Sequence, residues 1–167
     1  MKVIKKQLNS RMCAVCGLDN EFGLRAPFYS MEDGSVVTLF TYRPEHQSYP
    51  GRVHGGLIAS MIDELGLRAL WAKELKETSW GVTTSLEVKY RKPVTYNQPL
   101  KAKGMVIKDT PHFFVVHAWI YSNDGAFLLA EGESRYLKVP VDKLGDNISE
   151  HEEMCYLIED GVTDIDI

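Results

Sequence analysis

The chain has 167 residues, 44% of them hydrophobic and 25% charged, which is the composition of one globular domain with its own core. A formal net charge of -4 argues against nucleic acid as a partner. No apolar run approaches the roughly 20 residues that a membrane span needs, and the N-terminus lacks the apolar centre of a secretory signal. We therefore expect no membrane partner and a cytoplasmic location.

Residues 1–30 are predicted to be an N-terminal leader and covering segment, with a polar leader or short helix over 1–12. Residues 13–30 are rich in turn formers, so we expect this segment to cover another part of the domain and not to form a strand of the sheet. The segment carries Cys13 and Cys16, a single Cys-x-x-Cys pair. Three cysteines are too few for a disulfide framework, and a structural zinc site needs about four ligands. We predict reduced, structural cysteines and no metal, in preference to a metal or redox site.

The rest of the chain is predicted as one strand, one long helix and four further strands, which is an α+β domain over 31–140 with one helix against an antiparallel sheet. The helix is expected over about 55–76. The strands are expected over 35–42, 82–90, 100–108, 113–121 and 126–139, with turns at Asp33-Gly34 and Asp124-Gly125. Residues 141–167 are predicted to be an acidic appendage, partly helical near 146–158 and then frayed.

Several residues of the later strands are too apolar to remain in water, so we expect the chain to oligomerise. These residues are Phe113, Val115, Trp119, Leu128 and Leu129.

The start of the predicted helix is unusual because it carries two consecutive glycines, Gly55 and Gly56. Each glycine inside a helix costs about 0.5–1 kcal/mol relative to alanine. The first N–H groups of a helix lack internal partners and favour negative charge. The pair is therefore a candidate site for an anion or oxyanion.

Asp63 is the carboxylate that follows this helix start. The core-facing stripe predicted for the helix consists of Leu57, Ile58, Met61, Ile62, Leu65 and Ala69. Asp63 lies about 160° from the centre of that stripe, beside Ala59 and Gly66. We therefore expect Asp63 to face solvent or another chain, and Glu64 to pair with Arg68 one turn later.

The run His54-Gly55-Gly56, six residues and then Asp63, resembles the motif of hotdog-fold acyl-CoA thioesterases. The PaaI-like and mammalian acyl-CoA thioesterase-like groups of the 4-hydroxybenzoyl-CoA thioesterase superfamily are the most similar. The resemblance extends over about residues 13–139. It includes Gly81-Val82-Thr83, which opens a strand, and Tyr90-Arg91-Lys92-Pro93, which ends that strand.

The resemblance implies a hotdog fold, in which an antiparallel sheet of about five to six strands wraps around one long central helix. It also implies a homodimer that joins the two sheets edge to edge. Whether two such dimers assemble into a tetramer is left open. Active sites would lie at the dimer interface, where the helix start of one chain faces Asp63 of the other. The substrate would be an acyl-CoA thioester, and no cofactor would be needed.

The catalytic roles that the resemblance implies fall on four residues. The Gly56 N–H, with Gly55, would polarise the thioester carbonyl. Asp63 would act as a general base on water or as a nucleophile. Thr83 would orient the water, and His54 would align the carbonyl or support its loop. As plain structural residues, Asp63 would be a solvated helix residue, His54 a turn residue and Thr83 an ordinary strand threonine.

Four further residues are candidates for substrate binding. Gln47 or Ser48 would take the place of the Asn that some relatives use to position water. Arg91 and Lys92 would bind CoA phosphates at a strand end, and a solvated charge pair is the equally weighted alternative. Guesses for the acyl lining are Tyr49, Trp71 and Trp80; the acyl group itself stays open, because two subunits would build the pocket.

Two other functions compete with hydrolysis. One is a non-catalytic acyl-CoA binding protein, because a fold does not fix a function. The other is hydration or dehydration of enoyl thioesters, which is disfavoured because no histidine follows Asp63 within the predicted helix.

Overall fold

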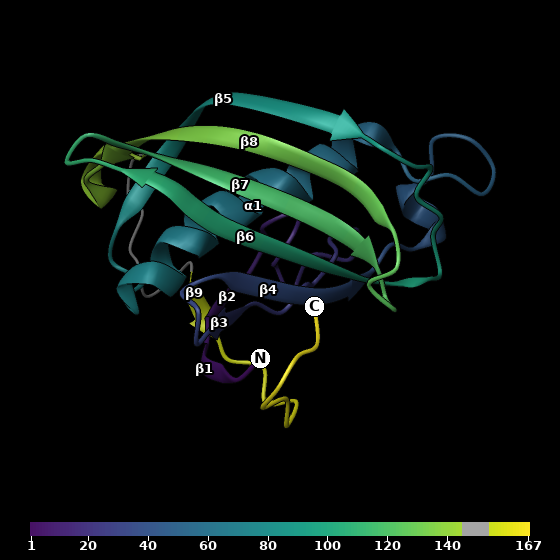
Figure 1. Ribbon diagram of the computed structural model, residues 1–167, viewed down its shortest axis with the longest axis horizontal. Coiled ribbons are helices and arrows are strands. Elements are labelled where there is room, and N and C mark those ends of the chain that lie inside the picture. The colour runs from purple at the N-terminus through teal and green to yellow at the C-terminus, as the bar shows by residue number, and fades with distance from the viewer. Residues whose placement is uncertain (145–153) are drawn as a thin grey trace.

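A computed structural model describes residues 1–144 and 154–167, and one long helix wrapped by a curved antiparallel sheet forms its centre (Figure 1). The helix, α1, covers Gly55–Glu74. The sheet has seven strands in the spatial order β1-β3-β4-β6-β7-β8-β5. They are β1 (Val3–Lys6), β3 (Tyr29–Met31), β4 (Val36–Thr41), β5 (Trp80–Tyr90), β6 (Pro99–Asp109), β7 (Phe113–Ser122) and β8 (Leu128–Val139). The predicted α+β arrangement is confirmed.

Short elements complete the described part of the chain. Two 3-10 turns, η1 and η2, cover Pro44–His46 and Val141–Lys143. β2 (Asn9–Ser10) and β9 (Met154–Tyr156) pair as a separate two-stranded sheet. The long helix ends two residues earlier than predicted, because Leu75 takes a left-handed conformation (φ 54°) that cannot continue an α-helix.

The prediction for the N-terminal segment is wrong in its local structure. Residues 1–12 form β1 and β2 in place of a leader or helix, and β3 begins within the stretch that was not expected to join a sheet. β1 pairs with β3, for example Lys5 with Ser30. Both strands are short, and β1 finds its partner far away in the sequence, so a local pattern does not show it. β3 also pairs with β4 across the predicted Asp33-Gly34 turn. β1 and β3 take the sheet from the five to six strands expected to seven.

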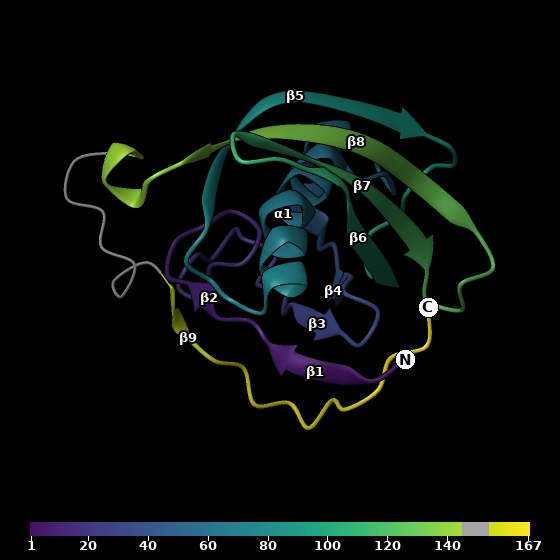
Figure 2. The same ribbon diagram turned by 60° about the vertical axis from the view of Figure 1, so that its left-hand side comes forward.

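The chain end is also paired, whereas the sequence predicted fraying. The Val3 N–H donates to the Thr163 carbonyl at 2.8 Å, and the Ile165 N–H donates to the Met1 carbonyl at 2.9 Å. Ile165 is buried, and Figure 2 shows this last segment running along β1. The helix predicted near 146–158 lies mostly outside the described residues, and its last part is β9. The division into 1–30, 31–140 and 141–167 remains a prediction.

The core lies between α1 and the concave face of the sheet. The predicted helix stripe is confirmed, since Ile58, Met61, Ile62, Leu65 and Ala69 are buried and Leu57 packs against them. Alternate residues of β7 face this stripe and are fully buried, namely Phe114, Val116, Ala118 and Ile120. Period-2 alternation of this kind is what places one face of a strand in a core.

The N-terminal segment covers a second side of α1, as the sequence predicted. Arg68 is 1% exposed, and its guanidinium donates to the Leu8 carbonyl at 2.6 Å. It also pairs with Glu64 at 2.9 Å, which confirms the predicted ion pair, and lies 4.6 Å from the ring centre of Phe28. A buried charge is tolerated only with such partners.

The outer face of the sheet is partly covered by its own side chains. The rings of Trp119 and His117 stack at 4.5 Å, and Arg135 lies 3.9 Å over the ring of Phe113. Leu129, which was expected to be covered by another chain, is instead buried in the core of its own chain. In the described ranges, 1–144 and 154–167, no helix is long and apolar enough to cross a membrane.

Candidate active site

The start of α1 is capped by the histidine that precedes the two glycines. His54 has an extended backbone, and its Nδ1 accepts a hydrogen bond from the Gly56 N–H at 2.9 Å. The predicted Gly56 oxyanion donor is therefore engaged within its own turn in this structure. The Gly55 N–H has no acceptor among the described residues, so it is the unpaired donor at this helix start.

Packing inside the chain explains only one of the two glycines. A Cβ on Gly56 would lie 3.1 Å from His54 Nδ1, which is tight, whereas a Cβ on Gly55 would lie 3.5 Å from the Tyr90 hydroxyl, an ordinary contact. The absence of a side chain at Gly55 thus leaves room for a group from outside this chain. The Tyr90 hydroxyl donates to the Gly55 carbonyl at 3.0 Å and ties β5 to the helix start.

A pocket of about 390 Å³ opens in front of this helix start. Four of the predicted binding residues line it, together with Tyr49 and Tyr90; the four are Ser48, Gly55, Arg91 and Lys92. Gln47 is not part of the lining and forms a bridge with Val53 across the loop.

Strong interactions inside the chain already engage both cationic residues of the pocket. Arg91 donates twice to Glu131, at 2.8 and 2.5 Å. The Lys92 ammonium lies 4.1 Å over the ring of Phe127. Each residue can still present part of its charge at the pocket, because both are exposed.

Asp63 is held by hydroxyl groups of its own sheet. Its Oδ1 accepts from the Thr83 hydroxyl of β5 at 2.8 Å and lies 3.3 Å from the Tyr136 hydroxyl of β8. The expectation that Asp63 faces only solvent or another chain is thus wrong, because the sheet curves far enough for β5 and β8 to reach this side of α1. Among the described residues Oδ2 has no partner, so one carboxylate oxygen is free for chemistry.

Tyr136 is a site residue that the sequence did not reveal. It is 2% exposed, and its hydroxyl lies 2.8 Å from both the Asp63 carbonyl and Ser134 Oγ. Burial raises the pKa of Tyr136, so its hydroxyl stays a proton donor at neutral pH. Its ring stacks on Phe114 at 4.7 Å. No local motif marks it, because the contact joins residues 73 positions apart.

Gly66 makes room for Tyr136. A Cβ added at Gly66 would lie 1.9 Å from the Tyr136 hydroxyl oxygen, which no packing permits. The small residue beside Asp63 therefore serves a contact within this chain.

Replacing Gly66 with alanine is expected to lower the free energy of unfolding by about 1–3 kcal/mol, because Tyr136 must leave its stacked and hydrogen-bonded position. Urea unfolding measures this. Gly55→Ala is the matched control, since its Cβ has space and alanine favours helix, so its free energy of unfolding should not fall. Equal stability of both variants would show that the Tyr136 contact is not needed.

The helix start and Asp63 are too far apart to act together within one chain. Asp63 follows Gly56 by seven positions, which is about 10 Å along a helix axis. In one chain, the unpaired Gly55 N–H therefore has no carboxylate near it. Asp63, further along the helix, has no unpaired N–H donor near it.

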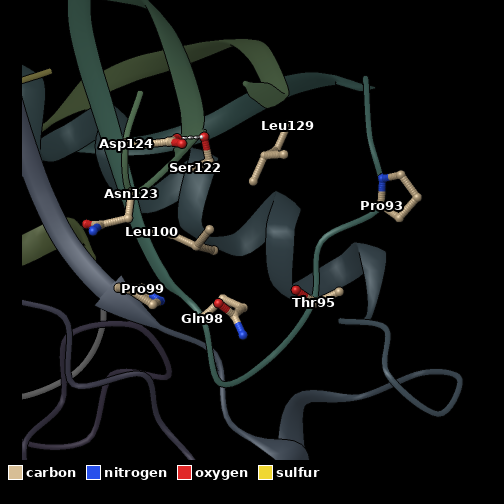
Figure 3. Close-up of a pocket in the computed structure, with 9 residues that line it drawn as sticks. All are labelled: Pro93, Thr95, Gln98, Pro99, Leu100, Ser122, Asn123, Asp124 and Leu129. Atoms are coloured by element: carbon tan, nitrogen blue, oxygen red, sulfur yellow. Dashed lines mark hydrogen bonds between the residues drawn. The ribbon is translucent and has the colours of Figure 1, made fainter. Parts of the chain in front are cut away.

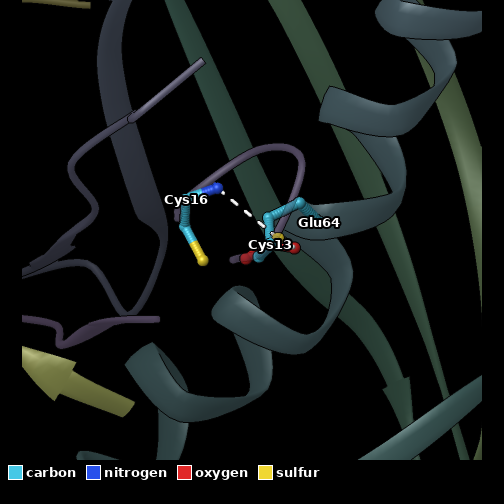
Figure 4. Close-up of side chains that lie close together, drawn as sticks. All are labelled: Cys13, Cys16 and Glu64. Atoms are coloured by element: carbon cyan, nitrogen blue, oxygen red, sulfur yellow. Dashed lines mark hydrogen bonds between the residues drawn. The ribbon is translucent and has the colours of Figure 1, made fainter. Parts of the chain in front are cut away.

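Other clusters of the described residues offer different chemistry. A second depression of about 390 Å³ lies beyond Pro93, but its carboxylate, Asp124, already accepts from the Ser122 hydroxyl (Figure 3). Cys13, Cys16 and Glu64 form the group of candidate metal ligands found in the described ranges (Figure 4). His46, not considered from the sequence, is a buried structural residue that contacts the Phe22 carbonyl at 2.8 Å.

Comparisons with known proteins agree with this architecture. The sequence profile of the Thioesterase superfamily matches residues 50–128. The acyl-coenzyme A thioesterase THEM4 of Rattus norvegicus is 26% identical over 127 residues, which cover 76% of this chain and 52% of that protein. The chain thus spans about half the length of the curated relatives it matches.

Solved structures give the same result. A thioesterase superfamily protein superposes with a TM-score of 0.66 at 26% identity, over 75% of this chain and 63% of that one. The protein smu.793 from Streptococcus mutans UA159, solved bound to acetyl CoA, superposes with a TM-score of 0.59 at 18% identity, over 69% of this chain and 89% of that one. The hotdog fold predicted from the sequence is confirmed.

Proposed function

We propose that this chain, which has the hotdog fold and matches the Thioesterase superfamily profile over residues 50–128, hydrolyses acyl-CoA thioesters to a free acid and coenzyme A. The observation that carries the proposal is Asp63, whose Oδ1 is fixed by Thr83 and Tyr136 while its Oδ2 is free. The similarity to an acyl-coenzyme A thioesterase supports the choice of substrate class.

The active form in this proposal is a dimer joined along β5. Among residues 1–144 and 154–167 this strand pairs with β8 along one edge, and its other edge has no strand partner there. Three apolar side chains of β5 are well exposed: Val82 (41%), Leu86 (37%) and Tyr90 (54%). A second copy paired along this edge would cover them.

The dimer brings together the two features that one chain keeps apart. The helix start of one chain meets Asp63 of the other. The unpaired Gly55 N–H donates a hydrogen bond to the thioester carbonyl. The Gly56 N–H donates as well when its hydrogen bond to His54 opens. Such donors stabilise the oxyanion that forms when the carbonyl carbon is attacked. Arg91 and Lys92 at the pocket rim attract the phosphates of CoA.

Asp63 acts in its ionised form in this mechanism. It either takes a proton from the attacking water or attacks the thioester carbon itself, and the Thr83 hydroxyl holds it in position. A single turnover in ¹⁸O-labelled water separates the two routes. A general base delivers the labelled oxygen directly to the released acid, whereas hydrolysis of an acyl–Asp63 anhydride at the Asp63 carboxyl leaves the label on Asp63 and unlabelled oxygen in the acid. The acyl–sulfur bond breaks, and the thiol of CoA leaves with a proton.

A panel of short, medium, long and aromatic acyl-CoAs tests the function, with detection of the free thiol. We expect wild-type protein to release CoA from at least one of them. Binding of acyl-CoA without release of thiol would overturn the proposal in favour of a non-catalytic binding protein. The absence of a histidine in α1 after Asp63 argues against enoyl-thioester hydration.

A further inference from the structure

Cys13 and Cys16 form a fixed turn that faces α1. Their two sulfur atoms and a carboxylate oxygen of Glu64 lie within 4.8 Å of one another (Figure 4). The turn is closed by the Gly17 N–H, which donates to the Cys13 carbonyl at 2.9 Å. A Cβ on Gly17 would lie 2.5 Å from that carbonyl oxygen, so the turn requires glycine there. The chain thus brings two thiols together by a specific local structure.

The two thiols have different surroundings. Both cysteines line an apolar pocket of about 320 Å³ that Trp71 and Trp80 also line, but Cys16 is only 2% exposed, whereas Cys13 is half-buried. The N–H groups of Val15 and Cys16 lie 3.3 and 3.5 Å from Cys13 Sγ and donate to it. One thiol can therefore be reached by a small molecule, and the other lies behind it.

The same contacts separate the acidities of the pair. The hydrogen bond from the Cys16 thiol lowers the pKa of Cys13, and the backbone N–H donors add to this. That bond and burial raise the pKa of Cys16. An accessible thiol with a lowered pKa beside a buried thiol is the arrangement of dithiols that undergo exchange.

Arg68 argues against a metal ion at this cluster. Its guanidinium donates to Glu64 Oε1 at 2.9 Å and is itself fully buried. A divalent cation would have to compete with this fixed positive charge for the same carboxylate. The cluster also offers three ligand atoms from described residues, whereas a structural zinc site uses four.

We propose that Cys13 and Cys16 are a redox-active dithiol site that exchanges with low-molecular-weight disulfides such as glutathione disulfide. The Cys13 thiolate attacks one sulfur of the disulfide, which forms a mixed disulfide and releases one thiolate. The Cys16 thiol then gives its proton to the released thiolate, and the Cys16 thiolate attacks Cys13 Sγ, which forms the Cys13–Cys16 disulfide and releases the second thiolate. The two protons lost by the cysteines are taken up by the two released thiolates. Glu64 first accepts the proton of Cys13, since the Cys13 thiol donates to it at 3.5 Å.

This inference replaces the sequence-based expectation of purely structural cysteines, and it does not depend on thioester hydrolysis. The test uses the reduced full chain, equilibrated in buffers of increasing glutathione disulfide, quenched with acid and alkylated before mass spectrometry. We expect loss of two alkylation sites, mapped to Cys13 and Cys16, with no glutathionyl group retained.

Single variants identify the role of each thiol. Cys16→Ser is expected to trap one glutathionyl group on Cys13, and Cys13→Ser to abolish the intramolecular disulfide. Cys155→Ser is the matched control, because Cys155 is exposed and lies outside the cluster; it should leave the Cys13–Cys16 disulfide unchanged.

Three results would overturn the proposal. One is full alkylation of both Cys13 and Cys16 in wild type at every glutathione ratio. Another is a glutathionyl group found on Cys155 but not on Cys13 in the Cys16→Ser variant. The third is tightly bound zinc in the protein as isolated, with both thiols protected until a chelator removes it. The wild-type measurement decides the matter even if a variant fails to fold.

Discussion

Replacing Asp63 with asparagine is expected to lower kcat for acyl-CoA hydrolysis by about 10²–10⁴-fold, the contribution of a positioned general base. Asparagine has the same shape, and its side-chain oxygen can still accept from the Thr83 hydroxyl and lie beside Tyr136. The free oxygen becomes an amide that can neither take a proton from water nor attack the thioester carbon. The loss should therefore be in kcat, with the fold retained.

The measurement is steady-state kinetics on the acyl-CoA that wild type hydrolyses fastest, with urea unfolding to verify that the variant is folded. Asp142→Asn is the matched control, since Asp142 is an exposed aspartate in η2 and should leave kcat unchanged. If a folded Asp63→Asn enzyme kept most of the wild-type kcat, Asp63 would have no catalytic role.

The helix and the four long strands could be predicted because their signals are local. The stripe from Ile58 to Ala69 has the spacing of one helix face, and β7 alternates buried and half-buried residues along most of its length. β1 is shorter than five residues and pairs only with β3, a distant segment. This pairing depends on the tertiary structure, which a pattern within a short window does not contain. β3 is equally short, but it pairs locally with β4 across the predicted Asp33-Gly34 turn.

The candidate site was predictable in its residues but less so in its contacts. A helical wheel gives the direction of Asp63 relative to the core stripe, yet it does not give the curvature of the sheet. That curvature brings Thr83 and Tyr136 to the carboxylate. The wheel also does not show that the Gly56 N–H is used by His54. Thr83 was identified through the family resemblance, and Tyr136 had no signal of its own.

Mixing two inactive variants is expected to restore activity if each site is built from two chains. Gly55→Ala adds a Cβ beside the unpaired N–H, which takes up space that a substrate carbonyl needs at the helix start, and Asp63→Asn removes the carboxylate. Each variant alone should lose about 10²-fold or more of the wild-type kcat. In a mixed dimer, the intact helix start of one chain meets the intact Asp63 of the other, so one of the two sites is complete.

Random mixing makes half of the dimers mixed, so the recovered activity should approach about a quarter of the wild-type value. The two variants carry different affinity tags and are produced together, so that mixed dimers can be isolated and should reach about half of wild type per dimer. The control is a dimer of two Asp63→Asn chains that carry the two different tags, and its kcat should stay at the level of the single variant. Activity of the isolated mixed dimer that stayed at the level of the single variants would place the helix start and Asp63 in separate sites, and the shared-site dimer would be wrong. Restoration, in contrast, requires that the two halves meet across chains, because no single chain in the mixture carries both.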